Sequence, residues 1–338
     1  MAKFSVATIA DKVPAQHRGT TALLFVILGS LGIQTSTAVV STLFTEFSPI
    51  SIAGLRMASA AVILLLLVRP RPSRLLRSDW PQVVLYGVVV TLMTIGYFGA
   101  VKYIPLGIAV TIEFLGAFGV SLLGVRRWRD GLLSIGALVG VILIAGPTFE
   151  NSHAIGYLFG ALSALCMGGY TLLSARMGHG SPAVEGLKGL TLSITISALL
   201  LAPFSVPAIP HLHTDAWIRV LLAGAFGVAL AYSADGIAGR LTSAAVIGVL
   251  FSLDPVIGAL IGTVLLGEVL PLPAYLGILL IAVSGAVLVW QTNRSGLKIP
   301  VHTAVLDAIV STKTGQLPAI KPQQRRPHHP KSEENQKK

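Results

Sequence analysis

Hydrophobic residues in this chain gather into long blocks that are separated by short polar stretches. The blocks are about 20 residues long, which is the length an α-helix needs to cross a ~30 Å hydrocarbon core. A helix also satisfies its own backbone hydrogen bonds where water is absent. The pattern therefore predicts an all-α polytopic membrane protein with ten transmembrane helices, at residues 21–40, 49–68, 81–101, 106–124, 131–147, 154–174, 184–203, 216–234, 242–264 and 272–290.

The composition supports the same class. Hydrophobic residues make up 53% of the chain and charged residues 12%, against about 25% charged residues in a soluble globular protein. Residues 292–338 are rich in Lys, Arg, Pro, Gln and His, a composition that cannot bury a core. We expect a disordered basic cytoplasmic tail at 292–338 and a short cytoplasmic N-terminal segment at 1–20.

A short phrase occurs twice and divides the chain into halves. Each copy opens an apolar run and carries one cation inside it, and the two cations lie 132 positions apart. Because each half has an odd number of spans, the second half has to insert in the opposite orientation. We therefore expect two inverted five-helix repeats, at 21–147 and 154–291. The copies are Ser48-Pro49 with Gly54-Leu55-Arg56, and Ser181-Pro182 with Gly186-Leu187-Lys188.

The net charge of +11 reflects topology. Basic patches also bind nucleic acid, but here the arginines occupy alternate loops, which is the positive-inside pattern and puts both termini in the cytoplasm. We expect membrane lipids around the chain and no nucleic-acid partner. The loop arginines are Arg69, Arg71, Arg74, Arg77, Arg126, Arg127, Arg129, Arg176 and Arg240, and the opposite loops carry Glu46, Glu150 and Glu268, which we interpret as ordinary loop acids.

Signals for cofactors and catalysis are lacking in the sequence. Cys166 is the single cysteine and lies inside the sixth predicted span, so no intramolecular disulfide can form. The chain contains no Gly-x-x-x-x-Gly-Lys phosphate loop. No histidines at zinc-ligand spacing and no His-acid dyad occur within the spans. We therefore expect no cofactor and no metal, and we do not expect an enzyme.

Two charges lie at matched depth in the first half. Arg56 and Glu113 each follow the start of a span by seven residues, or roughly 10 Å at 1.5 Å per residue. A charge at the centre of a membrane helix costs at least ~2.5–3.5 kcal/mol and needs a reason. The two residues are natural partners. Either they form a fixed ion pair between helices, or Arg56 contacts a substrate carboxylate and Glu113 carries a proton or contacts a substrate ammonium group.

The second half carries three further charges. Lys188 is the counterpart of Arg56, and it serves either as a gate or substrate contact or as a lysine that reaches the inner headgroups. Asp254 precedes Pro255 near the middle of the ninth span, where the proline predicts a kink. A carboxylate beside such a break is a candidate ion or substrate site, or else it holds the kink. Asp235 lies at the predicted cytoplasmic edge of the eighth span, and we expect it to be interfacial.

Uncharged polar and small residues add further candidates. Tyr97 and Tyr232 occur in the third span of each half and either line a cavity or pack in the core. Gln34 either holds helices together or contacts the cavity. Small-residue faces let helices approach closely, and we expect them to pack within a monomer or, less favourably, in a weak homodimer. These faces are Gly136 with Gly140, Gly156 with Gly160, and Gly258 with Gly262.

Several stretches resemble the EamA branch of the drug/metabolite transporter superfamily, from about residue 21 to 291. The resemblance implies an inner-membrane exporter of amino acids or similar metabolites, driven by the proton gradient. The chain departs from the pattern of such exporters at Ala117 and Ala231, where they have prolines, and at Asp235 and Asp254, where they have glutamates. The resembling stretches are Tyr86-Gly87-Val88 and those at 103–123, 229–238 and 251–270, together with Gly54-Leu55-Arg56 and Leu266-Gly267-Glu268.

The residues and the resemblance together predict a secondary active transporter whose substrate cavity lies between the two halves. We expect proton-coupled export of small amino acids or related metabolites. Export of hydrophobic or cationic drugs is the alternative, although only 7% of the residues are aromatic and few rings are left for a cation-binding cage. A passive channel or scaffold stays open as a further alternative, and it would be insensitive to mutation of the acids.

Overall fold

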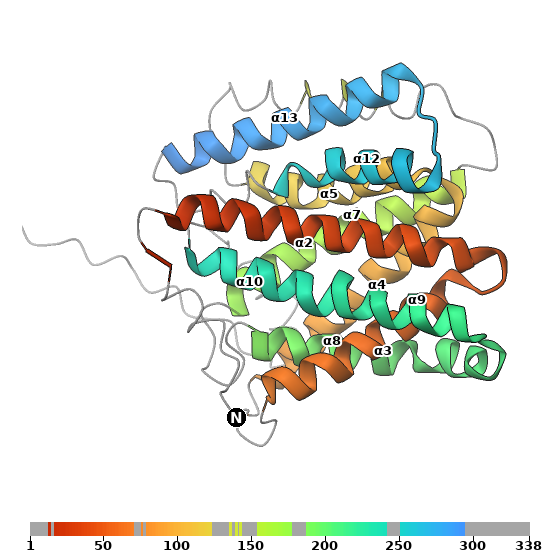
Figure 1. Cartoon of the computed structure of the whole chain (residues 1–338). Helices are drawn as coiled ribbons and strands as arrows, with labels where there is room; N and C mark the ends of the chain where they lie inside the picture. Colours follow the sequence, from red (N-terminus) through yellow and green to blue (C-terminus); the bar gives the residue numbers. More distant parts are fainter. Residues whose placement is uncertain are drawn as a thin grey trace, which may run out of the picture. The chain divides into compact units, whose positions relative to one another are not determined.

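The structure is a computed structural model. It describes residues 13–14, 17–70, 76, 79–123, 135–136, 139–140, 142–143, 154–177, 187–241 and 251–294. Every regular element within these ranges is helical, as the hydrophobic blocks predict. Figure 1 shows long helices running beside one another through the described part of the chain.

The helices of the first half begin and end close to the predicted positions. The ends of the third predicted span, 81–101, move by two residues at most. The second predicted span, 49–68, is reproduced without change. Pro49 stands in the first turn of its helix, where its missing N–H leaves no hydrogen bond unmade. The elements are α2 (Arg18–Ser41), the 3₁₀ turn η2 (Thr42–Thr45), α3 (Pro49–Val68), α4 (Trp80–Tyr103) and α5 (Leu106–Leu123).

The second half has the same order of helices, but its third span includes a π-helical segment. Its third span is continuous from residue 214 to 241 and contains a π-helical segment, η5, so it is longer than the predicted 216–234. The elements are α7 (Ala154–Met177), α8 (Leu187–Ser205), the 3₁₀ turn η4 (Val206–His211), α9 (Thr214–Gly224), η5 (Ala225–Leu230), α10 (Ala231–Leu241), α12 (Asp254–Leu266) and α13 (Leu272–Arg294).

Membrane spans are supported over most of the chain. Within the described residues, six helical segments are long and apolar enough to cross a membrane, and three shorter apolar helices accompany them. Together they fall in nine of the ten predicted spans. The remaining span, at 131–147, lies largely outside the described residues, as does the start of the ninth, so the count of ten stays a prediction. Most of the loop arginines also lie outside them, and so do the basic ends of the chain.

Corresponding helices of the two halves pack against each other in opposite directions. The Ser51 hydroxyl at the start of α3 donates to the carbonyl oxygen of Phe204 at the end of α8, at 2.7 Å. Likewise α5 pairs with α12, where Leu106 at the start of α5 lies against Gly262 and Val110 further along α5 lies against the earlier Gly258. Antiparallel packing of counterparts is what two inverted repeats require.

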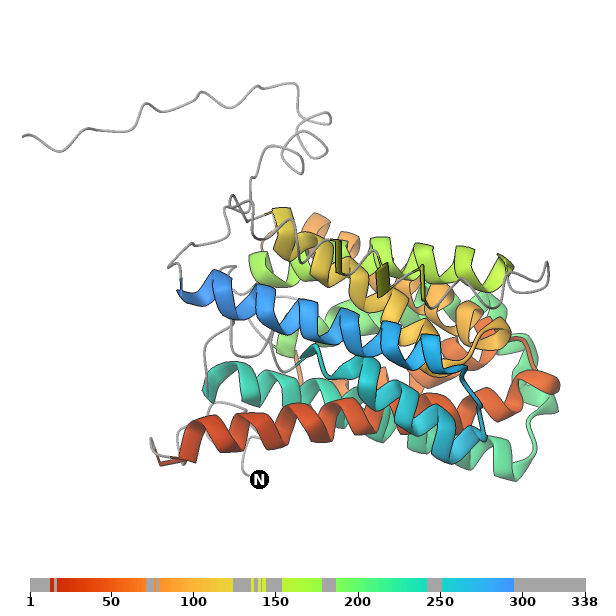
Figure 2. The ribbon, with the colours of Figure 1, turned by 90° about the horizontal axis from the view of Figure 1, so that it is seen from above.

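Other contacts between the halves occur in matched sets, in which each helix is replaced by its counterpart from the other half. Contact of α4 with α7 is matched by contact of α9 and α10 with α2, and contact of α5 with α7 is matched by contact of α12 with α2. In the same way, α4 with α8 corresponds to α9 with α3. Figure 1 shows α2 alongside α10 and α12, and Figure 2 shows α5 between α7 and α12. The packing therefore has the twofold relationship that the repeated phrase predicts.

Small-residue faces mediate these contacts inside the chain. A Cβ atom built on Gly156 would lie 2.7 Å from Ile104, and one built on Gly258 would lie 2.9 Å from Val110. Gly140 faces Ile281 in the same way. These glycines therefore pack against other helices of the same chain.

Large apolar residues cover the outside of the described bundle, and its largely apolar interior also contains polar residues. Leu66, Leu158 and Leu165 are among the most exposed side chains, whereas Gln34 and Arg56 are each 4% exposed. Exposed leucines suit a bundle surrounded by lipid tails, and buried charges in such a bundle face its interior.

Candidate functional site

Arg56 is held between three helices from both halves. It lies two turns into α3, and its Nη2 donates to Ser36 Oγ of α2 at 3.0 Å and to the carbonyl oxygen of Gly227 in η5 at 3.1 Å. The guanidinium lies 5.3 Å from the centre of the Phe98 ring on α4, which is within cation–π range. Nε of Arg56 is buried and has no hydrogen-bond partner. The side chain thus keeps a donor available in the interior.

The π-helical segment explains how a backbone carbonyl comes to face Arg56. A π-bulge changes the hydrogen-bond register and is frequent at functional sites. Gly227 is also required sterically, because a Cβ atom there would overlap Ser36 Oγ and lie 2.8 Å from Arg56 Nη2. Glycine therefore brings η5 close enough for the contact.

Glu113 has a different partner from the one predicted. Its Oε1 accepts a 2.7 Å hydrogen bond from the hydroxyl of Ser163 on α7. No direct ion pair joins it to Arg56 among the described side chains, although the two charges still attract each other electrostatically. Of the two alternatives for these residues, the fixed Arg56–Glu113 ion pair is not found among the described side chains. Arg56 is satisfied by oxygens of α2 and η5, and Glu113 faces α7 instead.

Tyr97 and Gln34 form a buried polar contact between α4 and α2. The Tyr97 hydroxyl donates to Gln34 Oε1 at 2.8 Å. The Tyr97 ring lies edge-on to Phe98, with centroids 5.8 Å apart, and Phe98 carries the guanidinium of Arg56. Gln34 thus joins α2 to α4 through Tyr97, whose ring contacts the Phe98 ring that faces Arg56.

Asp254 stands at a helix break, as its proline predicted. It is the first residue of α12, and Pro255 occupies the first turn. Oδ1 of Asp254 is buried without a hydrogen-bond partner. Ser30 Oγ of α2, also buried and unpartnered, lies beside this carboxyl group without hydrogen-bond geometry.

Asp235 is part of the interior and is not interfacial. Its helix continues six residues further to Leu241, and Oδ1 of Asp235 is buried without a partner. The carboxyl group rests over Gly29 of α2, where a Cβ atom would lie 2.8 Å from Oδ1. The prediction failed because the span extends beyond residue 234, so Asp235 lies within it.

The two tyrosines of the repeat differ in their surroundings. Tyr97 is 6% exposed, whereas Tyr232 on α10 is half-buried. Tyr232 interacts electrostatically with Arg56, Glu113 and Asp235, so it lies among the charged groups of both halves.

Lys188 does not mirror the environment of Arg56. It is exposed at the second residue of α8, while Arg56 is buried. The repeated phrase thus places one cation in the interior and the other near the described start of a helix.

Sequence reasoning missed the role of Glu268. This residue follows α12, and both of its carboxylate oxygens accept from the backbone N–H of Leu106, at 2.9 and 3.0 Å. Leu106 is the first residue of α5, where helical N–H groups lack partners and negative charge is favoured. Partial burial raises the pKa of Glu268, and the hydrogen bond from Leu106 opposes that rise. Glu268 is therefore a helix cap between the halves, and its description as an ordinary loop acid was wrong.

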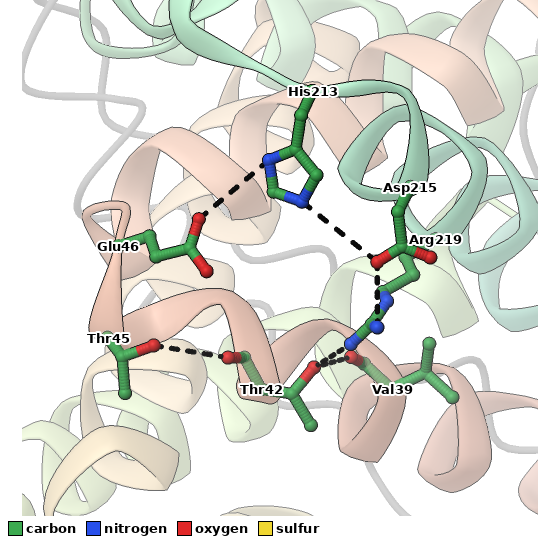
Figure 3. A network of polar contacts seen from close by, with 7 residues as sticks. All are labelled: Val39, Thr42, Thr45, Glu46, His213, Asp215 and Arg219. Atoms are coloured by element: carbon green, nitrogen blue, oxygen red, sulfur yellow. Dashed lines mark hydrogen bonds and ion pairs between the residues drawn. The ribbon is translucent and has the colours of Figure 1, made fainter.

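A second network joins the halves near the start of α9. Figure 3 shows His213 between Glu46 and Asp215, with Nδ1 3.8 Å from Glu46 and Nε2 4.0 Å from Asp215. Asp215 also pairs with Arg219 at 2.7 Å, and Arg219 donates to Thr42 at 2.7 Å. These side chains are exposed and belong to the side that the charge pattern predicts to be external.

Comparison with known proteins decides the family. The model of the EamA-like transporter family matches residues 20–149 and 154–290. The chain belongs to the EamA-like transporter family. It is accordingly a member of a transporter family and not an enzyme.

Individual proteins that this EamA-like transporter resembles share a low sequence identity with it. It is 26% identical over 181 residues to the threonine/homoserine exporter RhtA of Salmonella typhimurium (strain SL1344) and to that of Escherichia coli (strain K12). The match spans 54% of this chain and 61% of the length of each relative. A chain of known crystal structure superposes with a TM-score of 0.53 at 21% identity, covering 81% of this chain and 96% of that one, which supports the fold alone.

Proposed function

We propose that this EamA-like transporter is a proton-coupled exporter of small amino acids, of the threonine/homoserine type, or of related metabolites. It would act in the bacterial inner membrane, with both termini in the cytoplasm, the repeats at 21–147 and 154–291, and membrane lipids around it. The similarity to RhtA supports this substrate class. The observation that carries the proposal is the buried Arg56, which retains a free donor at Nε.

A guanidinium with a free donor in a low-dielectric interior suits a substrate carboxylate. Charge-assisted hydrogen bonds of this kind are the strong ones, and Ser36 and Gly227 hold the guanidinium in place from one side. A purely structural arginine would instead have all its donors satisfied by protein groups. Arg56 therefore receives the carboxylate of the substrate.

The coupling proton needs an acid that can change its protonation state. Glu113 interacts electrostatically with Arg56, and no ion pair joins the two among the described side chains. Its hydrogen bond from Ser163 leaves the second carboxylate oxygen to take a proton. Glu113 couples transport to protons, while Tyr97, Tyr232 and Gln34 line the cavity. Asp254 belongs to the coupling machinery, and Lys188 contacts the substrate at the entrance.

Counterflow in reconstituted vesicles tests this assignment against a panel of amino acids. Arg56→Lys is expected to weaken substrate exchange about tenfold or more, because a hydrogen bond to a charged group is worth about 1.5–3 kcal/mol. Arg219→Lys, an exposed arginine on the other network, is the matched control and should exchange normally. Equal exchange by both variants would exclude Arg56 from the binding site.

Coupling is tested separately at Glu113. Glu113→Gln is expected to retain counterflow, which needs no net proton movement, and to lose efflux driven by a pH gradient. Glu46→Gln, an exposed acid, is the control. Retained coupling in Glu113→Gln would remove Glu113 from the mechanism, and drug export in place of amino-acid exchange would refute the substrate class.

A further inference from the structure

Helix α2 and the two helices packed against it, α10 and α12, each carry a buried side-chain oxygen without a hydrogen-bond partner. Oδ1 of Asp235, Oδ1 of Asp254 and Oγ of Ser30 are all buried and unsatisfied. Buried polar atoms are nearly always paired in folded proteins, and unpaired ones indicate a ligand or a functional proton. Ser30, at 4% exposure, lies beside Asp254, and Asp235 interacts electrostatically with Asp254.

This acid pair is separate from the contact site of Arg56. Asp235 lies eight residues after Gly227 on the same span, or about 12 Å along a helix at 1.5 Å per residue. On α2, Gly29 beneath Asp235 lies seven residues before Ser36, which contacts Arg56, or about 10 Å. Both helices therefore place the pair a similar distance from Arg56, toward the end of α10 that the charge pattern predicts to be cytoplasmic.

Electrostatic interactions link Glu113 to the two acids of this site. Glu113 interacts electrostatically with Asp254, and Asp254 interacts with Asp235. The three residues come from three helices, α5, α12 and α10. Chains of buried acids in membrane proteins serve as proton relays, and close carboxyl groups in a low dielectric take up protons as a coupled unit.

We propose that Asp254 and Asp235, with Ser30 beside them, form the inner proton site of this transporter, and that Asp235 releases the coupling proton toward the cytoplasm. This inference rests on the proposed function. In the transfer step the O–H bond of protonated Glu113 breaks and an O–H bond forms at the Asp254 carboxylate. A second transfer of the same kind protonates Asp235. One proton moves and no other bond changes.

The occupant is a proton because the site offers too few oxygens for a metal ion. Hard cations take six or more oxygen ligands, while the side chains of Asp235, Asp254 and Ser30 carry five oxygens between them. The titratable groups that face the pair from neighbouring elements are Tyr170 and Tyr232, which interact with Asp235, and Glu113 and Tyr97, which interact with Asp254. None of these described neighbours is a cation that would neutralise both carboxylates.

Transport measurements on Asp235→Asn provide the first test. The variant is expected to retain counterflow of the wild-type substrate and to lose efflux driven by a pH gradient, while Asp235→Glu restores it. Asp215→Asn, an exposed acid paired with Arg219, is the control and should couple normally. Normal coupling in Asp235→Asn overturns the proposal. So does loss of counterflow at normal amounts of folded protein, because Asp235 would then serve the substrate or the fold.

A glycine pair on α2 tests the same site without removing an acid. Gly29→Ala places a Cβ atom against Asp235 Oδ1, whereas Gly19 has no atom within 4 Å of a built Cβ. Gly29→Ala is expected to shift the pH profile of efflux, and Gly19→Ala to leave it unchanged. Identical pH profiles for both variants would contradict a proton site at Asp235.

Infrared difference spectroscopy separates this inference from the proposed function, because it needs no substrate. Purified wild-type protein is expected to gain a carboxylic acid C=O band when the pH is lowered, and both Asp235→Asn and Asp254→Asn should reduce that band. If no amino acid is exchanged but the band depends on both residues, the substrate class fails and the proton site stands. A band that neither substitution changes refutes the proton site.

Discussion

Arg56 donates a 3.1 Å hydrogen bond to the carbonyl oxygen of Gly227, which lies 171 positions further along the chain and in the other half of the molecule. The bond joins α3 to the π-helical segment of the eighth span. Alternating access requires the two halves to move relative to each other around a central site. A charged residue of one half that is held by the backbone of the other half links the site to that movement.

The fit around Gly227 gives the first prediction. Gly227→Ala is expected to destabilise the protein by about 1–3 kcal/mol, the usual cost of overpacking a tight interior. The added methyl group would meet Ser36 and Arg56. Thermal unfolding of detergent-purified protein measures the effect. Gly119→Ala on α5, where a Cβ meets no atom within 4 Å, is the control, and equal melting temperatures for both variants would contradict the tight fit.

The bond between Tyr97 and Gln34 gives the second. Tyr97→Phe leaves a buried amide oxygen without its donor, which costs about 1–3 kcal/mol. Adding Gln34→Leu is expected to recover much of this loss, because replacing both partners by apolar groups is nearly neutral. A double-mutant cycle of unfolding free energies tests the coupling. Additive effects of the two substitutions would show that the contact contributes nothing.

Glu268 gives the third prediction, which concerns the cap on α5. Glu268→Ala removes both acceptors of the Leu106 N–H and is expected to cost about 1–3 kcal/mol. Glu268→Gln keeps an acceptor and should cost less. Glu46→Ala, an exposed acid outside this cap, serves as the control for thermal unfolding. If Ala and Gln at position 268 are equally stable, the cap has no energetic role.

The pH dependence of stability follows from the same residue and forms the fourth prediction. Because the pKa of Glu268 is raised in the folded protein, folding favours its protonated form. The stabilising contribution is therefore complete below the ordinary carboxyl pKa and declines as the pH rises through the raised value. Glu268→Gln should lack this decline. A melting temperature that depends on pH identically in both proteins would exclude Glu268 as the titrating group.

The exposed network of Figure 3 gives a contrasting, fifth prediction. Asp215→Asn is expected to change the unfolding free energy by less than about 1 kcal/mol, because exposed ion pairs gain little and salt screens them. The Arg219–Asp215 pair is short but lies at the surface. Unfolding at low and high salt measures the effect. A loss as large as that of Glu268→Ala would show that the network is a main link between the halves.

The positions of most of the described helices could be predicted from the sequence alone. The span predicted at 49–68 coincides with α3, and Asp254 with Pro255 marks the start of α12. Helix length in a bilayer and the effect of proline depend on local properties of the chain. The repeated phrase likewise indicated the inverted halves, because an odd number of spans reverses orientation.

The partners of the polar residues could not be predicted in this way. The sequence singled out Arg56 and Glu113 but did not indicate that they contact Gly227 and Ser163, and it left Glu268 in a loop and Asp235 at an interface. Each of the real contacts joins helices far apart in the chain, as with Leu106 and Glu268, 162 positions apart.

The physical reason lies in the membrane environment. Spans that are apolar all round show little periodicity of hydrophobic and polar residues, so their sequence does not indicate which face turns inward. The sequence does determine where helices cross the membrane and which residues are costly to bury. Only the packing of the two halves decides which face of each helix turns inward, and therefore whether a buried charge meets a carbonyl, a hydroxyl or another acid.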